Sequence, residues 1–359
     1  MSSQKTPLYE FHKSLGARFV PFAGWEMPVQ YSSILEEHKA VREEVGLFDV
    51  SHMGEAWITG PQAENCINTL VTNDISRIAD NQAQYTVMCQ PDGGCVDDLI
   101  VYRFSRERYL LCLNAGNTPK DIAWITNHTK DFDCELQDAS QDYALLALQG
   151  PLAEEVIAQL IPGHTPLKRF TFQEINIEDV SIILSATGYT GENGYELYCP
   201  AAQANILAGA LIKAGKPYNI KPCGLGARDS LRLEAGYPLY GHEINETISP
   251  LQGGLSWVVK LKKESFVGKD ALLKEKEAGL KRKIHFFTLE GRRIAREGTP
   301  VYAGEIQVGE VRSGSHSPLL GHPIGSALID ENRDPSISLE VDLRGNRAHL
   351  NLKKPPLHL

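Results

Sequence analysis

Residues 93–104 read Gly-Gly-Cys-Val-Asp-Asp-Leu-Ile-Val-Tyr-Arg-Phe, a run of β-branched and aromatic residues behind two glycines. This run follows a Pro91-Asp92 turn, so it predicts the second arm of a β-hairpin whose first arm is 84–89. Strand alternation then places five side chains on one face: Val96, Asp98, Ile100, Tyr102 and Phe104. Asp98 is the polar member of this otherwise apolar face. A carboxylate there costs several kcal/mol or shifts its pKa upward, so Asp98 is either a hydrated or Arg-paired strand-end acid or a functional one.

Composition limits the class of protein. With 359 residues we expect two or three domains, and 42% hydrophobic with 23% charged residues is typical of a globular chain. The net charge of −9 argues against a nucleic-acid binder. None of the seven cysteines is spaced as a metal ligand, which favours reduced, structural thiols. No targeting segment and no long apolar run is visible, so we expect a soluble, cytoplasmic protein that does not bind membranes.

The order of strand and helix signals predicts an α+β fold with antiparallel sheets, because hairpins alternate with helices and long all-apolar strands are missing. The composition shifts near residue 280. From there the chain shows short strand signals separated by turns, at 284–289, 299–302, 307–311, 325–329, 338–341 and 348–353. This spacing predicts a small closed β domain. We therefore expect one region over 1–279 and a C-terminal domain over 280–359.

A second dense stretch, 187–198, carries three glycines around a tyrosine and predicts a loop that approaches a ligand closely. Its glycine spacing fits neither a phosphate loop nor a dinucleotide fingerprint. Glu196 emerges on the next strand, as an exposed residue or as a ligand-binding one. The helix predicted over 223–237 carries Arg232 and Glu234, which we interpret as a surface ladder. For His52 a hydrogen-bonded structural role is favoured over a catalytic one.

The tyrosines beside the glycine loops, Glu196 and Asp98 together suit a flat heteroaromatic ligand. Tyrosines can sandwich its ring, and a carboxylate such as Glu196 can accept two parallel hydrogen bonds from an N–H/NH₂ edge. A buried Asp near reactive nitrogens could orient the substrate and handle a proton or stabilise a cation.

Almost the whole chain resembles the T-protein of the glycine cleavage system, a tetrahydrofolate-dependent aminomethyltransferase. The resemblance lies in six motifs in order: FAGWEMP at 22–28, GLFDVSHMGE at 46–55, GGCVDDLIVY at 93–102, TGYTGENGYEL at 187–197, CGLGARDSLRLEAGYPLYG at 223–241 and SGSHSPLLG at 313–321. It implies transfer of the aminomethyl carbon from the lipoyl arm of a partner H-protein to tetrahydrofolate, with release of ammonia. It also implies two intertwined domains and a C-terminal β-barrel around a central folate channel, in a monomer that needs no metal, flavin or nucleotide.

The resemblance also implies roles for individual residues. Asp98 would lie by the folate nitrogens that accept the one-carbon unit and would support the transfer. Glu196, Tyr189 and Arg228 would bind the pterin. The rest of the folate pocket would be lined by Met53, Tyr85, Ile100, Tyr102, Asn114, Tyr237 and Trp257. One departure concerns the tail, where His358 stands near the position at which the family often has an Arg.

Three alternatives compete with this interpretation. The first is a folate-dependent demethylase or an amine-oxidising relative, although no flavin domain is attached. The second is the non-catalytic folate-binding protein of iron–sulfur assembly, which is disfavoured because 264–270 contains no Cys. The third is a scaffold protein, which would have no use for Asp98 on an apolar face.

Overall fold

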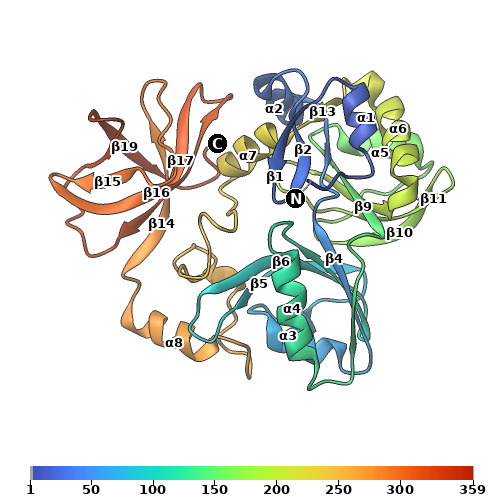
Figure 1. Ribbon diagram of the computed structural model, residues 1–359, viewed down its shortest axis with the longest axis horizontal. Coiled ribbons are helices and arrows are strands. Elements are labelled where there is room, and N and C mark those ends of the chain that lie inside the picture. Colours follow the sequence, from blue (N-terminus) through green and yellow to red (C-terminus); the bar gives the residue numbers. More distant parts are fainter. Residues whose placement is uncertain (1–2, 359) are drawn as a thin grey trace. The chain divides into compact units, whose positions relative to one another are not determined.

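The computed structural model describes residues 3–358, with the elements labelled in Figure 1. It divides into two compact units, which we treat separately. Unit 1 comprises Met1–Ile67, Ile75–Tyr85 and Leu99–Arg228. Unit 2 comprises Asn68–Asp74, Thr86–Asp98 and Asp229–Leu359. The division passes through the predicted hairpin, so each of its strands begins in one unit and ends in the other.

The predicted hairpin is confirmed and forms the edge of a five-stranded sheet. Its strands are ordered β5 (Gln82–Cys89), β6 (Cys95–Ser105), β7 (Arg108–Leu113), β4 (Gly54–Thr59) and β8 (Glu135–Asp138). The turn closes through a 2.8 Å hydrogen bond from the Gln90 amide to the Gly94 carbonyl. Gly94 is required there, because a Cβ would lie 2.0 Å from the Glu246 carbonyl oxygen.

The register of this sheet defines the face that carries Asp98. Ile100 pairs with Cys112 on β7, and Cys112 pairs with Glu55 on β4. Directly paired residues point to the same side of a sheet. Asp98, Ile100 and Tyr102 therefore share a face with Cys112 and Glu55, as the alternation predicts for the first three.

Unit 1 also contains a six-stranded sheet. Its order is β10 (Phe172–Ile177), β11 (Val180–Ser185), β12 (Gly194–Pro200), β9 (Tyr143–Gln149), β3 (Gly46–Asp49) and β13 (Lys221–Cys223). All pairs are antiparallel except β13 with β3, which is parallel and departs from the expected antiparallel pattern. Helices α5 (Ala153–Leu160) and α6 (Ala204–Gly215) pack on each other and on β12, where they bury the main core of this unit.

The other elements of unit 1 are a two-stranded hairpin and shorter helices. They are β1 (Arg18–Phe22), β2 (Trp25–Gln30), α1 (Tyr9–Ser14), α2 (Ile34–Glu43), α3 (Ala63–Leu70, which continues into unit 2), the 3-10 turns Ile75–Arg77, Ala201–Gln203 and Lys216–Tyr218, and α4 (Thr118–Thr129). Ser33 caps α2 by accepting a hydrogen bond from the Glu36 amide. Gly46 follows this helix closely and starts β3, where a Cβ would meet Val41 at 2.5 Å.

Unit 2 contains the predicted closed β domain. Its strands are β14 (Arg282–Leu289), β15 (Pro300–Ala303), β16 (Ile306–Ser317), β17 (His322–Asp330), β18 (Leu339–Asp342) and β19 (Arg347–Lys353), closed in the order β14-β17-β16-β15-β18-β19. All six predicted strands are present. β16 is longer than expected and includes the motif at 313–317. Before the barrel the chain forms a 3-10 turn, Ser256–Val258.

Two helices complete unit 2, α7 (Leu225–Ala235, which begins in unit 1) and α8 (Lys269–Ala278). The surface ladder expected on α7 is wrong, because Arg232 is 2% exposed and Glu234 is fully buried. Arg232 donates to Ser313 on β16 and to Glu243, and Ser317 donates to Glu234. These charged residues hold α7 to the barrel.

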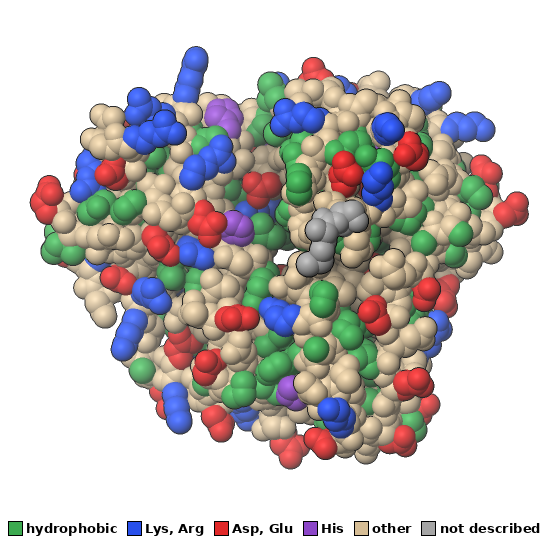
Figure 2. Space-filling view, viewed as in Figure 1, with side chains coloured by type: hydrophobic (Ala, Val, Ile, Leu, Met, Phe, Trp, Pro, Cys, Tyr) green, Lys and Arg blue, Asp and Glu red, His purple; other side chains and the backbone are tan. Residues whose placement is uncertain are grey.

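The surface drawn in Figure 2 carries acidic and basic side chains interspersed over most of its area. Among residues 3–358, no helix has the length and apolarity to cross a membrane. The seven cysteines are all free, and six of them are buried.

Candidate active site

Glu196 is the centre of a buried polar cluster in unit 1. It lies on β12, where it pairs with Ser185 of β11, and it is 7% exposed. Its Oε2 accepts a hydrogen bond of 2.5 Å from the Thr187 hydroxyl, which is 3.0 Å from the Ser185 hydroxyl. The strand therefore turns the Glu196 carboxyl inward, and the exposed alternative is wrong.

Two tyrosines connect this carboxyl to the face of the five-stranded sheet. The Tyr198 hydroxyl donates to the Tyr102 hydroxyl at 3.0 Å, and the Tyr102 hydroxyl is 3.3 Å from that of Thr187. Both rings are fully buried and meet edge to face with centroids 5.5 Å apart. Burial raises the pKa of both phenols well above the ordinary value, so both keep their protons. They are hydrogen-bond donors in this cluster.

Arg228 supplies the positive charge. It lies in α7, and its guanidinium is 4.7 Å from the centroid of the Tyr189 ring. Burial lowers its pKa, while Tyr189, Glu196 and Cys112 oppose that shift. An arginine stays charged at any working pH. The sequence-predicted pterin-binding residues Glu196, Tyr189 and Arg228 are therefore brought together, with Tyr102 beside them.

The Glu196 carboxyl titrates abnormally in this setting. Burial raises its pKa, although the hydrogen bonds from Thr187 and Tyr102 and the charge of Arg228 oppose the rise. A carboxylate has about four acceptor positions, so these contacts leave room for a further donor. An N–H/NH₂ edge would fill such positions and favour the ionised form.

The loop that follows β11 is fixed by two side chains. Arg42 of α2 donates at 2.8 Å both to the Thr190 carbonyl and to the Glu192 carboxylate. Gln149 donates to the Thr187 carbonyl and accepts from the Thr190 hydroxyl. We expected the backbone of this loop to approach a ligand closely, and this stays a prediction. At Gly188 the missing side chain makes room for Gln149, whose Oε1 would lie 2.0 Å from a Cβ at that position.

The other predicted folate-pocket residues of unit 1 are half-buried: Met53, Tyr85, Ile100 and Asn114. Three predicted residues belong to unit 2, namely Asp98, Tyr237 and Trp257. Asp98 is 9% exposed and close enough to Cys95 to raise the pKa of that thiol, after burial as the main cause. Trp257 is 57% exposed on its 3-10 turn. Asp98 is thus buried on the face that the alternation assigns to it.

The sequence reasoning missed Tyr198, Thr187 and Cys112. Tyr198 follows Glu196 by two residues on the same strand, so the alternation used for Asp98 would have found it. Cys112 precedes Asn114 by two residues, so the same alternation would have placed it on the face of that predicted residue. Thr187 gave no signal, because its role depends on how the chain turns between β11 and β12.

The tail carrying His358 is anchored in unit 2. The Leu357 amide donates to the Glu234 carbonyl at 2.6 Å, and the Leu357 side chain packs with Leu233 and Ile324. His358 itself is half-buried.

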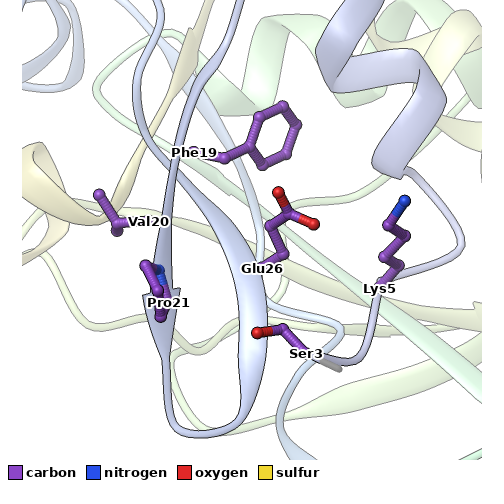
Figure 3. A pocket seen from close by; sticks show the side chains of 6 residues that line it. All are labelled: Ser3, Lys5, Phe19, Val20, Pro21 and Glu26. Atoms are coloured by element: carbon purple, nitrogen blue, oxygen red, sulfur yellow. The ribbon is translucent and has the colours of Figure 1, made fainter. Parts of the chain in front are cut away.

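A separate surface pocket lies beside the β1–β2 hairpin (Figure 3). It is lined by Ser3, Lys5, Phe19, Val20, Pro21 and Glu26. None of these is a predicted site residue. Over residues 3–358, no group of three or more His, Cys, Asp or Glu side chains is arranged to hold a metal ion.

Comparison with known proteins identifies the family. The family model "GCVT N-terminal domain" matches residues 8–263, and "Glycine cleavage T-protein C-terminal barrel domain" matches residues 282–358. The chain belongs to the glycine cleavage T-protein family. An aminomethyltransferase of Pseudothermotoga lettingae is 44% identical over 355 residues, covering 99% of this chain and 98% of the relative. An aminomethyltransferase from Halalkalibacterium halodurans is 49% identical over 328 residues, covering 91% of this chain and 90% of the relative.

A solved T-protein structure agrees with the fold. The crystal structure of the glycine cleavage system aminomethyltransferase T from Bartonella henselae superposes with a TM-score of 0.92 at 32% identity, covering 99% of this chain and 98% of that one. The resemblance stated from the six motifs, the α+β class with its C-terminal barrel and the enzyme class are thereby confirmed. This T-protein is an aminomethyltransferase of the glycine cleavage system.

Proposed function

We propose that this T-protein transfers the aminomethyl carbon of the dihydrolipoyl arm of H-protein to tetrahydrofolate. The products are ammonia, 5,10-methylenetetrahydrofolate and the reduced carrier. The observation that carries the proposal is the buried Glu196 carboxyl, held by Thr187 and faced by Arg228 and tyrosines, within a chain that belongs to the T-protein family.

Glu196 recognises the pterin in this proposal. The pteridine ring presents an N–H and an amino group side by side, and one carboxylate can accept both. Tyr189 offers an aromatic face for the ring, and Arg228 keeps that face and the carboxylate in place. Tyr102 supplies a hydroxyl donor, because burial raises its pKa well above the ordinary value and keeps it protonated at neutral pH.

Asp98 is the catalytic residue in this proposal. A carboxylate beside the reacting nitrogens orients the folate and stabilises the positive charge of an iminium-like carbon during transfer. Its burial and its place on the face with Ile100 and Tyr102 support this role. Met53, Tyr85, Ile100, Asn114, Tyr237 and Trp257 line the remaining part of the folate pocket.

The enzyme of this proposal needs one co-substrate and one protein partner. Tetrahydrofolate is its co-substrate, and the reaction uses no metal, flavin or nucleotide. H-protein is its partner, alongside the other components of the system, and the enzyme acts in the cytoplasm without binding nucleic acid or membrane. Residues 1–279 form the folate-binding region and 280–359 the barrel domain.

The test mixes the protein with aminomethyl-loaded H-protein and tetrahydrofolate and follows ammonia and methylenetetrahydrofolate. We expect equal amounts of both products. We expect Asp98→Asn to bind tetrahydrofolate but to turn over at least about 100-fold more slowly, the range typical of losing a positioned charge. Binding of folate without any reaction of the loaded carrier would overturn the proposal and direct the assay to small methylated amines. Equal turnover of both proteins would overturn the role of Asp98 alone.

A further inference from the structure

The turn between β3 and β4 carries a buried histidine where three segments of unit 1 meet. His52 is 4% exposed, and its ring lies edge to face with Phe22, with centroids 5.6 Å apart. Phe22 belongs to the tip of the β1–β2 hairpin. The adjacent residue of that tip, Ala23, lies within van der Waals reach of the Gly116 position. The start of β4 meets the same loop, since a Cβ on Gly54 would contact Thr118.

This junction adjoins predicted site residues on two sides. Met53 follows His52 directly, and Asn114 belongs to the loop that ends at Thr118. On another side, the charge of Arg228 reaches the imidazole, and Arg228 is also close to Glu196 and Tyr189. His52 therefore packs against Phe22 of the hairpin whose tip reaches the Asn114 loop, and it lies within electrostatic range of Arg228.

The hydrogen bonds of the turn do not require the imidazole. Asp49 holds the turn instead, accepting from the Ser51 amide at 2.9 Å, from the Thr6 hydroxyl at 2.6 Å and from the ring of His12 at 2.7 Å. His12 has a partner on each ring nitrogen, the second being the Tyr31 hydroxyl at 2.9 Å. Among the described residues, by contrast, the buried Nδ1 of His52 has no hydrogen-bond partner. A buried polar atom without a partner costs about 1–3 kcal/mol, and a catalytic role is one of the reasons for which proteins retain such an atom.

The surroundings keep this imidazole neutral. Burial, and after it the charge of Arg228, lower the pKa of His52 to about 4, although Asp49 opposes both. The hairpin tip 22–24 and the loop 114–118 contribute no titratable side chain. A neutral imidazole of low basicity accepts a proton from a strong acid only, such as an amine nitrogen that has just bonded to carbon and carries positive charge.

We propose that His52 is a proton-transfer residue of this reaction, which takes a proton from a folate nitrogen as that nitrogen bonds to the carbon and returns it to a leaving group. The inference rests on the proposed function. In the transfer two carbon–nitrogen bonds form, while one carbon–nitrogen and one carbon–sulfur bond break. The two folate nitrogens lose one proton each. One proton ends on the departing amine, which leaves as ammonia, and the other ends on the lipoyl sulfur, which leaves as a thiol.

The test compares three variants in the full chain. His52→Gln keeps a hydrogen-bonding amide but cannot relay a proton, and His52→Gly leaves space for added imidazole. His164→Gln is the matched control, because His164 is another histidine of unit 1 with a buried Nδ1 that lacks a partner among the described residues. Ammonia release from loaded H-protein, tetrahydrofolate affinity and thermal unfolding are measured for each.

We expect His52→Gln to lower kcat by about 10- to 100-fold with little change in tetrahydrofolate affinity, as for loss of a general acid–base group. We expect imidazole to restore turnover to His52→Gly in proportion to its neutral form, and His164→Gln to match the wild type. Turnover of His52→Gln within about twofold of the wild type would overturn the proposal. So would a loss that follows folate affinity or folding and is not rescued by imidazole. A wild-type chain that fails to transfer overturns the proposed function and this inference together.

Discussion

Glu196 accepts a 2.5 Å hydrogen bond from Thr187 inside a cluster that also contains the charged guanidinium of Arg228. Burial and pairing act on this carboxyl in opposite directions, and burial prevails, so its pKa is raised. Because the proposed pterin binding requires the ionised Glu196 carboxyl and burial opposes its ionisation, the pH dependence of tetrahydrofolate binding tests its role.

The first prediction concerns Glu196→Gln. We expect tetrahydrofolate affinity to fall by about 10- to 1000-fold, because an amide cannot accept two parallel hydrogen bonds. We expect the free energy of unfolding at pH 7 to rise. A carboxyl whose pKa is raised by folding contributes stability below its unfolded pKa and loses it as pH rises, and Gln removes that loss. Tetrahydrofolate titration and denaturant unfolding check both parts. Equal affinity would contradict the binding role. Glu174→Gln, which changes an exposed carboxyl on β10 of the same sheet, is the control.

The second prediction uses pH on the wild-type protein. If the ionised Glu196 binds the pterin, affinity should weaken as pH falls through the raised pKa of this carboxyl, starting above the ordinary range for glutamate. Tetrahydrofolate binding measured by fluorescence from pH 8 to pH 5 is the check. The same titration of Glu196→Gln should be flat apart from protonation of the ligand itself, which a ligand blank measures.

The third prediction concerns the buried ion pair of unit 2. Arg232 donates to Glu243 at 3.0 Å, and the side chains are 2% and 0% exposed. Replacing Arg232 by Met leaves a buried carboxylate unpaired, so we expect a loss of about 3–5 kcal/mol in unfolding free energy. The double variant with Glu243→Gln should lose less than the sum of the two single variants. Additive losses in denaturant unfolding would show that the pair does not couple.

The Glu243 carboxyl also gives this pair a pH signature. Burial raises its pKa, but Arg232 and the hydroxyls of Ser313 and Ser326 prevail and lower it below the ordinary value. A carboxyl with a depressed folded pKa contributes stability above its unfolded pKa and loses it as pH falls through the folded pKa. Acid unfolding should therefore be less steep in Glu243→Gln than in the wild type.

The fourth prediction concerns Lys263 in unit 2, which is 8% exposed. Its ammonium donates to the carbonyls of Asn68, Val71 and Asn73 at 2.6–2.7 Å, at the end of α3. We expect Lys263→Met to lose about 1–3 kcal/mol, because three carbonyls lose a donor. Burial lowers the pKa of Lys263 to about 7. The free energy of unfolding should therefore rise with pH between about 7 and the unfolded pKa of about 10.4, because the unfolded lysine binds more protons there. This rise should be absent in Lys263→Met.

The fifth prediction concerns Glu55, whose two carboxyl oxygens lack partners among residues 3–358. Burial raises its pKa well above the ordinary value, with Asp138 adding to the rise. Stability from this group is present below its unfolded pKa and is lost as pH rises, so Glu55→Gln should be more stable than the wild type at pH 7. Thermal unfolding of both proteins at pH 5 and pH 8 is the check. A smaller gain at pH 8 than at pH 5 would contradict the assignment.

Much of the fold could be predicted locally. The 93–104 stretch specified a strand and the inward face of Asp98, because side-chain alternation needs no partner to be known. The six barrel strands were visible for the same reason, since each is a short run bounded by turns. The parallel pairing of β13 with β3 could not be seen, because it joins segments about 175 residues apart.

The candidate site divides in a similar way. The sequence by itself determined which residues carry charge, hydroxyl and aromatic groups, and strand period determined the face of Asp98, Ile100 and Tyr102. The burial of Arg232 and Glu234 as structural charges became visible only in the tertiary structure, whereas the family resemblance had already grouped Arg228 with Glu196. The tertiary structure also decided that Gln149 needs Gly188 and that His52 lacks a partner for its buried Nδ1. The physical reason is that burial and pairing are set by groups distant in the chain, whereas periodicity is set by neighbours.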